Sequence, residues 1–335
     1  MKRILSIFIS LAILAIIYWK LNKHGQLHEL AQVFANCDRV WMAASLAMVV
    51  PLTLFTSWRL QQLMPQRGQL GFGEANKLIL VASVLNLVLP SKMGDIAKAW
   101  FMRERGHMSG ALSLSLVVFE KATDMLSLLW WCVFGLAWIK ISGAQALDAF
   151  GSPAFYWLAV LVVGGSLALG TLLIGSENFA HFFFVTGRKL APAKFSGKLA
   201  KLQEAWSEMH GYFWKSKAQL LKVSLTSIFI WFLHLLQIWM FILALKAWAP
   251  FLANLALSPL AILAGLLPLT FAGVGTRDAA LVLFYKPYFP AATAAALGLL
   301  CTARYLLPAI GGAPFVGEYF QIAKRISKNP QTAEA

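Results

Sequence analysis

Residues 86–100 read NLVLPSKMGDIAKAW, and this stretch decides how the chain must be threaded through a membrane. An apolar run reaches Pro90, and Lys92, Gly94 and Asp95 follow within five residues. The apolar part, residues 78–89, is shorter than the roughly 20 residues that a membrane-spanning helix needs. Its hydrophobicity favours the membrane interior, but its length excludes a simple crossing.

The composition places the whole chain among polytopic α-helical membrane proteins. Of 335 residues, 59% are hydrophobic and only 13% are charged, whereas a soluble domain carries about 25% charged residues. The short alternating strands of a β-barrel do not occur. The formal net charge of +15 is typical of basic cytoplasmic loops that contact anionic lipid headgroups, and we expect no nucleic-acid partner.

Six long apolar runs predict six spanning helices, and two shorter segments are interrupted. The first run ends in Tyr18, Trp19 and Lys20, which favours a retained interfacial anchor over a cleaved signal peptide. The interrupted segments lie near residues 78–100 and 256–285. The six runs are residues 4–19, 40–58, 111–139, 155–175, 220–247 and 293–322.

The distribution of basic residues predicts that both interrupted segments are re-entrant hairpins. Residues 59–77 and 91–110 are both rich in Lys and Arg, so both should be cytoplasmic. The segment between them must then enter and leave the membrane on the same side. When the rest of the chain is followed through the membrane by the same rule, residues 256–285 must begin and end on the opposite side. Both termini are then cytoplasmic. A multi-pass protein of the bacterial inner membrane is the expected setting.

The two predicted hairpins resemble each other in sequence. One reads LPSKMGD from Leu89, and the other reads LPLTFAGVGTRDAA from Leu267. Residues 40–139 and 220–322 therefore predict an inverted repeat with broken helices, as in many transporters. We expect residues 1–335 to form a single integral membrane domain. Within it, residues 176–219 form a basic cytoplasmic loop whose apolar spacing over 194–214 predicts an amphipathic surface helix.

Charged residues inside the long runs are candidates for a functional site. Glu120, Lys121 and Asp124 lie within run 111–139, and Arg304 lies within the last run. Each charge at that depth costs about 2.5–3.5 kcal/mol on insertion scales, so it needs a partner or a water-filled cavity. Two interpretations remain open: a structural ion pair, such as Arg304 with Glu120 or Asp124, and a polar cavity that meets a lipid headgroup.

The helix breaks offer a second set of candidates. Pro90 and Pro268 remove backbone donors, while glycines allow a close approach to a ligand. A helix that begins inside the membrane directs its positive end at the break, which suits a phosphate. Lys92 and Arg277 could add charge there, whereas Asp95 and Asp278 could instead be helix N-caps. The glycines concerned are Gly94, Gly273 and Gly275.

The sequence lacks the common signatures of metal sites and catalysis. The three cysteines and six histidines have no ligand spacing, so we expect no metal site, no cofactor and no catalytic residue. The GVGTRD stretch resembles a dinucleotide fingerprint only superficially, because no βαβ unit surrounds it. We therefore expect that the protein is not an enzyme.

Four motifs in order resemble the transmembrane region of lysylphosphatidylglycerol synthase and its stand-alone relatives. They are NLVLPSKMGDIAKAWFMRERG from Asn86, SLSLVVFEKATDMLSLL from Ser113, LLPLTFAGVGTRDAALV from Leu266 and ARYLLPAIGG from Ala303. The resemblance covers about residues 5–325 and implies a flippase-like protein. In two-domain members, aminoacyl transfer belongs to a separate soluble domain, so that activity does not carry over. Asp278 stands where the family often has glutamate, and Lys121 where arginine is frequent.

The main functional hypothesis is a flippase-like transporter that binds and translocates a lipid with a polar, phosphate-bearing headgroup. The lipid would be a phospholipid, a polyprenyl-phosphate-linked lipid or another glycolipid. The alternatives are a membrane-embedded transferase that uses a lipid-linked donor, and a non-transporting scaffold for a lipid-modifying enzyme. The proposed headgroup-binding residues are Asn86, Pro90, Lys92, Gly94, Asp95, Glu120, Lys121, Asp124, Pro268, Gly273, Gly275, Arg277, Asp278, Arg304 and Tyr305.

Overall fold

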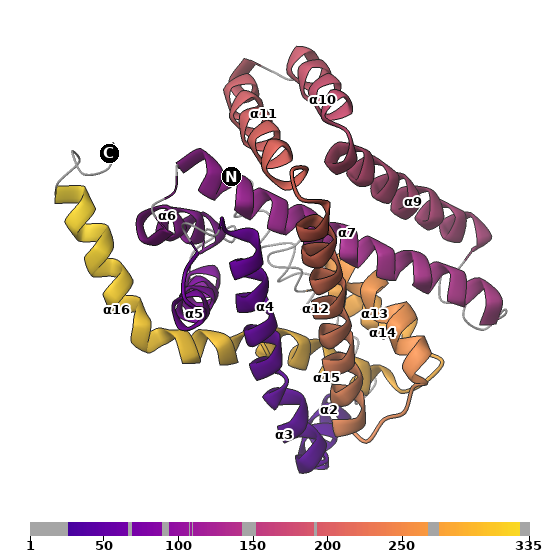
Figure 1. Cartoon of the computed structure of the whole chain (residues 1–335). Coiled ribbons are helices and arrows are strands. Elements are labelled where there is room, and N and C mark those ends of the chain that lie inside the picture. The colour runs from indigo at the N-terminus through magenta and orange to yellow at the C-terminus, as the bar shows by residue number, and fades with distance from the viewer. Residues whose placement is uncertain are drawn as a thin grey trace. The chain divides into compact units, whose positions relative to one another are not determined.

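The fold consists of helices joined by turns and short connections (Figure 1). The computed structural model describes residues 26–65, 69–88, 94–106, 108, 110–142, 152–190, 193–266 and 275–328. Within these ranges there is no β-strand, which confirms the predicted all-α class. The described helices are α2 (Gln26–Ala35), α3 (Arg39–Ala47), α4 (Val49–Leu63), α5 (Phe72–Val88), α6 (Gly94–Gly106), α7 (Gly110–Ser142), α9 (Pro153–Gly175), α10 (Glu177–Leu190), α11 (Ala193–Phe213), α12 (Lys217–Ala244), α13 (Phe251–Leu266), α14 (Thr276–Phe284), α15 (Ala291–Ala303) and α16 (Leu306–Lys328).

Five segments of the described chain are long and apolar enough to cross a membrane. Each coincides with one of the predicted runs, so a polytopic membrane fold is confirmed. The remaining predicted run, residues 4–19, lies outside the described residues. The five segments are Arg39–Leu63, Leu112–Ser142, Pro153–Gly175, Lys217–Ala244 and Ala291–Tyr319.

In both interrupted segments the structure describes two helices, one on each side of residues that lie outside the described ranges. α5 ends at Val88 and α6 begins at Gly94, while α13 ends at Leu266 and α14 begins at Thr276. The two helices of each segment pack against each other. With 17 and 16 residues, α5 and α13 extend about 26 and 24 Å, less than the roughly 30 Å of a bilayer core. Their re-entry from opposite sides of the membrane stays a prediction.

Local sequence explains where two of the spanning segments begin. Asp38 precedes α3, and its Oδ1 accepts hydrogen bonds from the backbone N–H of Val40 at 2.9 Å and of Trp41 at 3.1 Å. Ser152 precedes α9 in the same way, and Pro153 occupies the first helical position. These side chains satisfy amide donors that a helix start leaves without partners, and proline there loses no hydrogen bond.

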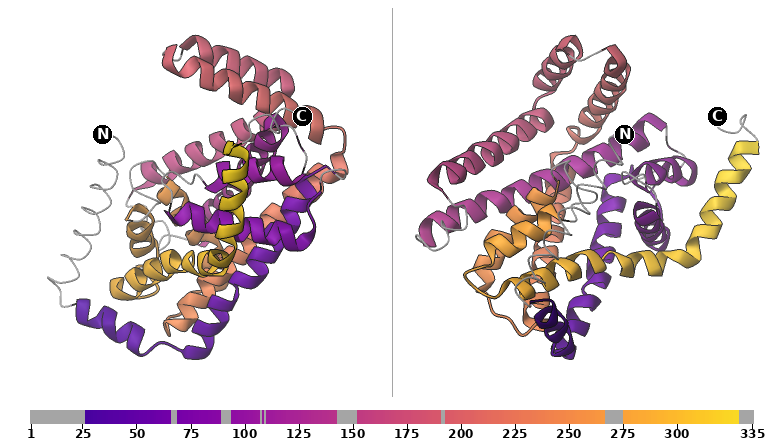
Figure 2. Two further views of the ribbon diagram at one scale, coloured as in Figure 1. Left: turned by 90° about the vertical axis from the view of Figure 1, so that its left-hand side faces the viewer. Right: turned by 180° about the vertical axis from the view of Figure 1, so that it is seen from behind.

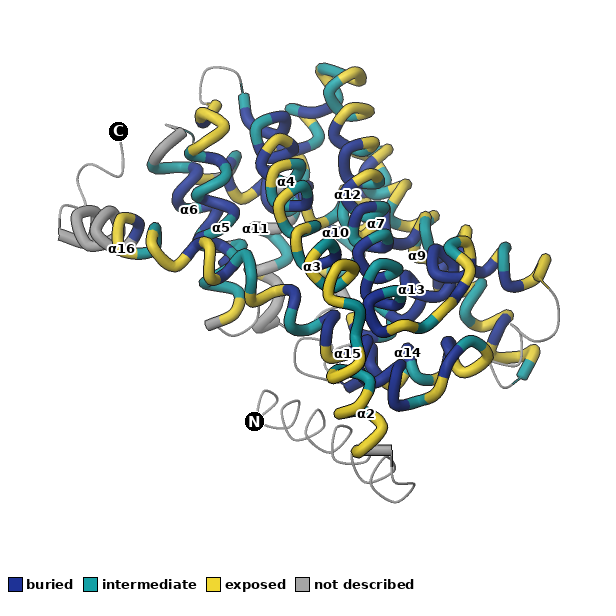
Figure 3. The backbone as a smooth tube through the Cα atoms, turned by 90° about the horizontal axis from the view of Figure 1, so that it is seen from below, coloured by how far each residue is buried: buried dark blue, intermediate teal, exposed yellow. Residues whose placement is uncertain are grey.

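The chain folds into two compact units, each assembled from three stretches. Unit 1 contains the described residues within 1–49, 122–176 and 227–304, and its core surrounds α13. Residues 253–261 of that helix are all buried (Figure 3). A Cβ at Gly135 of α7 would overlap the carbonyl oxygen of Ala256, so these two helices touch backbone to backbone. Small residues at such crossings are typical of membrane helices.

Unit 2 contains the described residues within 50–121, 177–226 and 305–335. α5 packs against both α6 and α16. Tyr319 of α16 donates a hydrogen bond to Glu74 Oε1 at 3.1 Å and packs edge to face on Phe101 of α6. Contacts from α16 therefore hold both helices of the first broken segment.

Gly312 sets how closely α16 approaches α5, and this leads to a stability prediction. A Cβ at this position would overlap the Leu80 carbonyl and stand 2.8 Å from Val84 Cγ2. We expect Gly312→Ala to lower stability by about 1–3 kcal/mol through overpacking, seen as a lower midpoint of thermal unfolding in detergent. Gly317→Ala in the same helix is the control, because a Cβ there meets no atom within 4 Å. Equal midpoints for the two variants would refute the close packing of α16 on α5.

Candidate functional site

The start of α6 lies directly against α5 at the break of the first segment. A Cβ at Gly94 would overlap the Ala82 carbonyl oxygen and stand 2.7 Å from Asn86 Oδ1. Only glycine fits this approach, and the close neighbour is α5 rather than the ligand suggested from sequence. Asn86 Oδ1 is buried and has no hydrogen-bond partner among the described residues. Pro90 and Lys92 lie outside the described residues.

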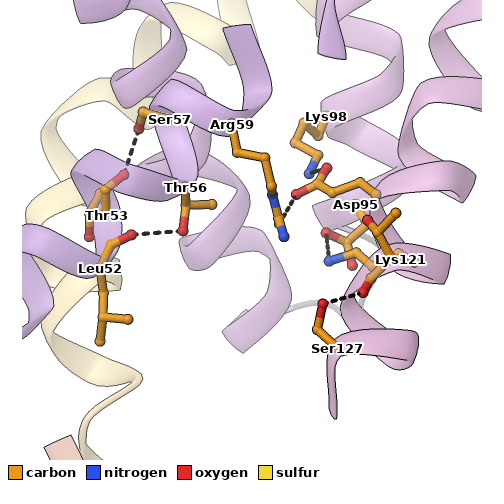
Figure 4. A network of polar contacts seen from close by, with 11 residues as sticks. Leu52, Thr53, Thr56, Ser57, Arg59, Asp95, Lys98, Lys121 and Ser127 are labelled. Atoms are coloured by element: carbon orange, nitrogen blue, oxygen red, sulfur yellow. Dashed lines mark hydrogen bonds and ion pairs between the residues drawn. The ribbon is translucent and has the colours of Figure 1, made fainter. Parts of the chain in front are cut away.

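Three charged side chains from three helices meet in the interior of unit 2. The Glu120 carboxylate on α7 accepts a hydrogen bond from Arg59 Nη2 of α4 at 2.9 Å, and a second from Lys98 Nζ of α6. All three side chains are 3% exposed or less. Figure 4 shows Arg59 and Lys98 approaching the same carboxylate. We call Arg59, Lys98 and Glu120 the charged triad.

A second ion pair lies next to the charged triad and is more accessible. Lys121 Nζ stands 3.2 Å from Asp95 Oδ1, and the two side chains are 47% and 16% exposed. Consecutive helical residues point about 100° apart, so Lys121 pairs with the first turn of α6 while Glu120 faces the triad.

Two cations share one carboxylate in the charged triad. The formal charge of these three side chains is therefore +1, and the pair of Lys121 with Asp95 adds none. Burying an ion is costly unless a counter-ion and hydrogen bonds satisfy it. Buried basic side chains such as these suit an anionic ligand, because Arg and Lys donate charge-assisted hydrogen bonds to phosphate or carboxylate oxygens.

Gln62 adds a buried donor one turn after Arg59 on α4. Its Oε1 accepts a hydrogen bond from Thr226 Oγ1 at 3.4 Å, and its backbone carbonyl accepts one from Gln219 Nε2 at 2.6 Å. Its own Nε2 is buried and has no acceptor among the described residues. Residues three apart on a helix share a face, so this donor lies on the same side of α4 as the charged triad.

The second broken segment uses its charges differently. Arg277 on α14 pairs with Asp278 Oδ1 at 2.7 Å and donates to the carbonyl of Gly298 at 3.1 Å and to Thr302 Oγ1 at 2.7 Å. Asp278 also accepts the backbone N–H of Gly275 at 3.0 Å. These contacts neutralise the pair and tie α14 to α15. The guanidinium therefore contributes to the fold of unit 1 rather than offering a free positive site.

The remaining predicted residues of unit 1 are placed as follows. Gly275 has φ 101°, a left-handed conformation that favours glycine, and Asp278 is the third residue of α14 rather than its N-cap. Arg304 ends α15 and donates to Gln237 Oε1 at 3.3 Å. Tyr305, which begins the unit 2 stretch, is exposed, and Asp124 is half-buried on α7. Pro268 and Gly273 lie outside the described residues.

The structure gives Glu120 and Arg304 contacts other than the ion pair suggested between them. Glu120, suggested above as a partner for Arg304, binds Arg59 and Lys98, and Arg304 binds the amide of Gln237. Sequence reasoning missed Arg59, Lys98 and Gln62 because they stand at the ends of apolar runs, where Lys and Arg are expected from topology alone. Helical periodicity could have indicated that Lys98 belongs with the candidate residues. Lys98 lies one turn after Asp95 on α6, and its neighbours in the chain are apolar.

Comparisons with known proteins agree with the resemblance noted in the sequence. Residues 4–312 match the family described as "Lysylphosphatidylglycerol synthase TM region". Over 242 residues the chain is 23% identical to the UPF0104 membrane protein MJ1595 of Methanocaldococcus jannaschii, which covers 70% of this chain and 71% of that protein. The family match includes both broken segments and the charged triad. The chain therefore belongs to the lysylphosphatidylglycerol synthase transmembrane-region family.

Proposed function

We propose that the protein is a flippase-like transporter that binds the phosphate-bearing headgroup of a membrane lipid and moves it between leaflets. The observation that carries the proposal is that two basic side chains, Arg59 of α4 and Lys98 of α6, are buried together on the Glu120 carboxylate inside unit 2. A phosphodiester carries one negative charge and several acceptor oxygens, which matches the charge and the donors of Arg59, Lys98 and Gln62. The family membership supports a lipid-related role.

In this proposal Lys121 makes the first contact with the headgroup. It is the most exposed of the charged side chains around Glu120, and its pair with Asp95 is accessible enough for an incoming anion to compete. The partly exposed pair costs little to open, because exposed ion pairs contribute only about 0–1 kcal/mol. The headgroup would then replace Asp95 as the partner of Lys121 and reach the donors deeper in unit 2.

The broken helices supply the second part of the proposal. α5 and α6 meet at a break in the first segment, and α13 and α14 do so in the second. In transporters built from inverted repeats, such breaks lie near the bilayer midplane and line the substrate site. From the loop charges we also propose that both segments are re-entrant and that both termini are cytoplasmic. We propose a bacterial inner membrane as the setting.

The transport proposal predicts a selective effect of Lys121 on lipid movement. In proteoliposomes that contain a fluorescent phospholipid, we expect Lys121→Gln to lower the rate of leaflet exchange by about 10- to 100-fold, which corresponds to losing one charge-assisted hydrogen bond. Lys121→Arg should retain most of the rate. Lys140→Gln is the matched control, because Lys140 lies near the other end of α7, over the ring of Trp157.

A panel of lipids distinguishes the proposal from its alternatives. The assay is repeated with a neutral glycolipid and with a polyprenyl-phosphate-linked sugar, and the products are analysed by mass spectrometry. Movement of phosphate-bearing lipids alone supports the proposal. A chemically changed lipid would indicate a transferase. Equal, slow movement of every lipid in wild type and Lys121→Gln would refute transport and leave the scaffold role.

A further inference from the structure

The helices α10 and α11 form a helical hairpin that the transport proposal does not use. They lie side by side (Figures 1 and 2) and pack along their length. Glu177 near the start of α10 accepts a hydrogen bond from Ser207 Oγ at 3.0 Å, and Phe184 packs on Trp206 with ring centroids 6.0 Å apart. The hairpin is therefore a defined element of unit 2 rather than an irregular loop.

The apolar face of α11 is used inside the protein. Met209 and Phe213 are 1% exposed. Phe213 stacks on Phe119 of α7, with ring centroids 4.0 Å apart. The predicted amphipathic helix over residues 194–214 is present, but this part of its apolar face covers unit 2 and is not available to a membrane surface.

Among the side chains that the structure describes, α10 carries a free apolar surface of the hairpin. Phe182 and Phe183 are 66% and 41% exposed, whereas Ala180 and Phe184 on the same helix are buried. α10 thus has one face against α11 and a second face that presents aromatic rings outward. Two phenylalanines exposed on one helix turn are costly in water and favourable in lipid.

Basic residues follow the exposed aromatic rings. Arg188 and Lys189 in the last turn of α10 are exposed. The sequence from residue 177 to residue 217 holds seven Lys or Arg and three Glu. An apolar face beside a basic end is the pattern of helices that lie in the interface of a membrane containing anionic lipids.

The chain path places α10 at the membrane surface. α9 is a candidate span of 23 residues that ends at Gly175, and only Ser176 separates it from α10. With 14 residues, α10 extends about 21 Å, which is too short to cross a bilayer core of about 30 Å. A helix that starts where a span ends, and cannot itself span, must run along the interface or away from it.

We infer that α10 is a docking surface for the anionic face of the bilayer, with Phe182 and Phe183 inserted among the acyl chains and Arg188 and Lys189 on lipid phosphates. The basic charge selects a bilayer that contains anionic lipids, because such surfaces attract Lys and Arg within a Debye length. The aromatic rings then provide the apolar area that holds the helix in the interface. This inference is independent of lipid transport.

The test measures how deep α10 lies in a bilayer of known composition. A nitroxide is attached through Phe182→Cys in full-length protein whose three native cysteines are replaced, and the protein is placed in lipid nanodiscs. The discs contain phosphatidylcholine alone or mixed with phosphatidylglycerol, at low ionic strength. Accessibility to oxygen, which enriches in lipid, is compared with accessibility to a water-soluble nickel chelate. A label through Glu204→Cys on the exposed side of α11 is the control.

The expected result is a label at position 182 that is shielded from the nickel chelate in discs with phosphatidylglycerol, while the label at position 204 stays in water. Arg188→Glu combined with Lys189→Glu should raise the chelate accessibility of position 182 at least about twofold. A label at position 182 that stays in water in anionic discs would overturn the inference and indicate a protein partner for this face. Equal shielding with and without the charge reversal, or in neutral discs, would overturn the role of anionic lipid.

Discussion

Replacing Glu120 by leucine is expected to produce the largest loss of stability of any single change in unit 2. The variant leaves Arg59 and Lys98 buried and without their shared carboxylate. Removing one partner of a buried ion pair costs about 3–5 kcal/mol, because the remaining charge is not compensated. We expect a correspondingly lower midpoint when the purified protein is unfolded by heat or by dodecyl sulfate.

A triple variant separates the charge from the packing. Arg59→Met, Lys98→Met and Glu120→Leu together replace the charged triad by apolar side chains, and such replacements are often neutral or stabilising. We expect this variant to unfold near the wild-type midpoint but to bind no phosphate-bearing lipid. Glu104→Leu is the control, because Glu104 belongs to a partly exposed ion pair with Arg103 on α6. If the triple variant is as unstable as Glu120→Leu alone, packing rather than charge governs this region.

Replacing Arg277 by lysine is expected to destabilise unit 1 without removing headgroup recognition. A lysine has a single donor nitrogen, so it cannot replace the contacts that Nε makes to Asp278, Nη1 to the Cys301 carbonyl and Nη2 to Thr302. Each hydrogen bond lost from a charged group costs about 1.5–3 kcal/mol. We expect a clear drop in the unfolding midpoint, measured as for Glu120.

The lipid assay then distinguishes a structural arginine from a binding one. The folded fraction of Arg277→Lys should move labelled phospholipid at the wild-type rate, because the Arg277 guanidinium is already held by unit 1. Lys286→Ala, on the exposed turn after α14, should change neither stability nor rate. A stable Arg277→Lys protein that no longer moves lipid would contradict the assignment and restore Arg277 to the headgroup site.

The two predictions express one difference between the broken segments. The first segment supplies Lys98 to the charged triad and Asp95 to the partly exposed pair with Lys121, and their partners come from α4 and α7. The second supplies a neutral pair whose hydrogen bonds hold its own helices together. We propose that the first repeat recognises the headgroup and that the second has kept the broken-helix architecture mainly as support.

Hydropathy and charge along the chain were sufficient for the class of fold and for most of its elements. The five apolar runs that fall in the described residues match the five candidate spans, and each interrupted segment contains two described helices. These features are local: a run of about 20 apolar residues favours a spanning helix wherever it occurs. Gly94 and Gly275 were also identified from sequence, because only glycine suits a close approach or a left-handed backbone.

The pairing of the charges was decided by tertiary structure alone. Arg59 and Glu120 are 61 residues apart in the chain and Lys98 is 22 residues from Glu120, so no local pattern predicts that they meet. The same holds for Arg277, which reads like a phosphate ligand at a helix start but finds its acceptors on α15. The amino-acid sequence by itself placed Glu120 and Arg304 inside apolar runs, where both are buried, because a spanning helix leaves them no exit to water. Only the packing of the helices decided that Arg59 and Lys98 are buried as well and that they meet Glu120.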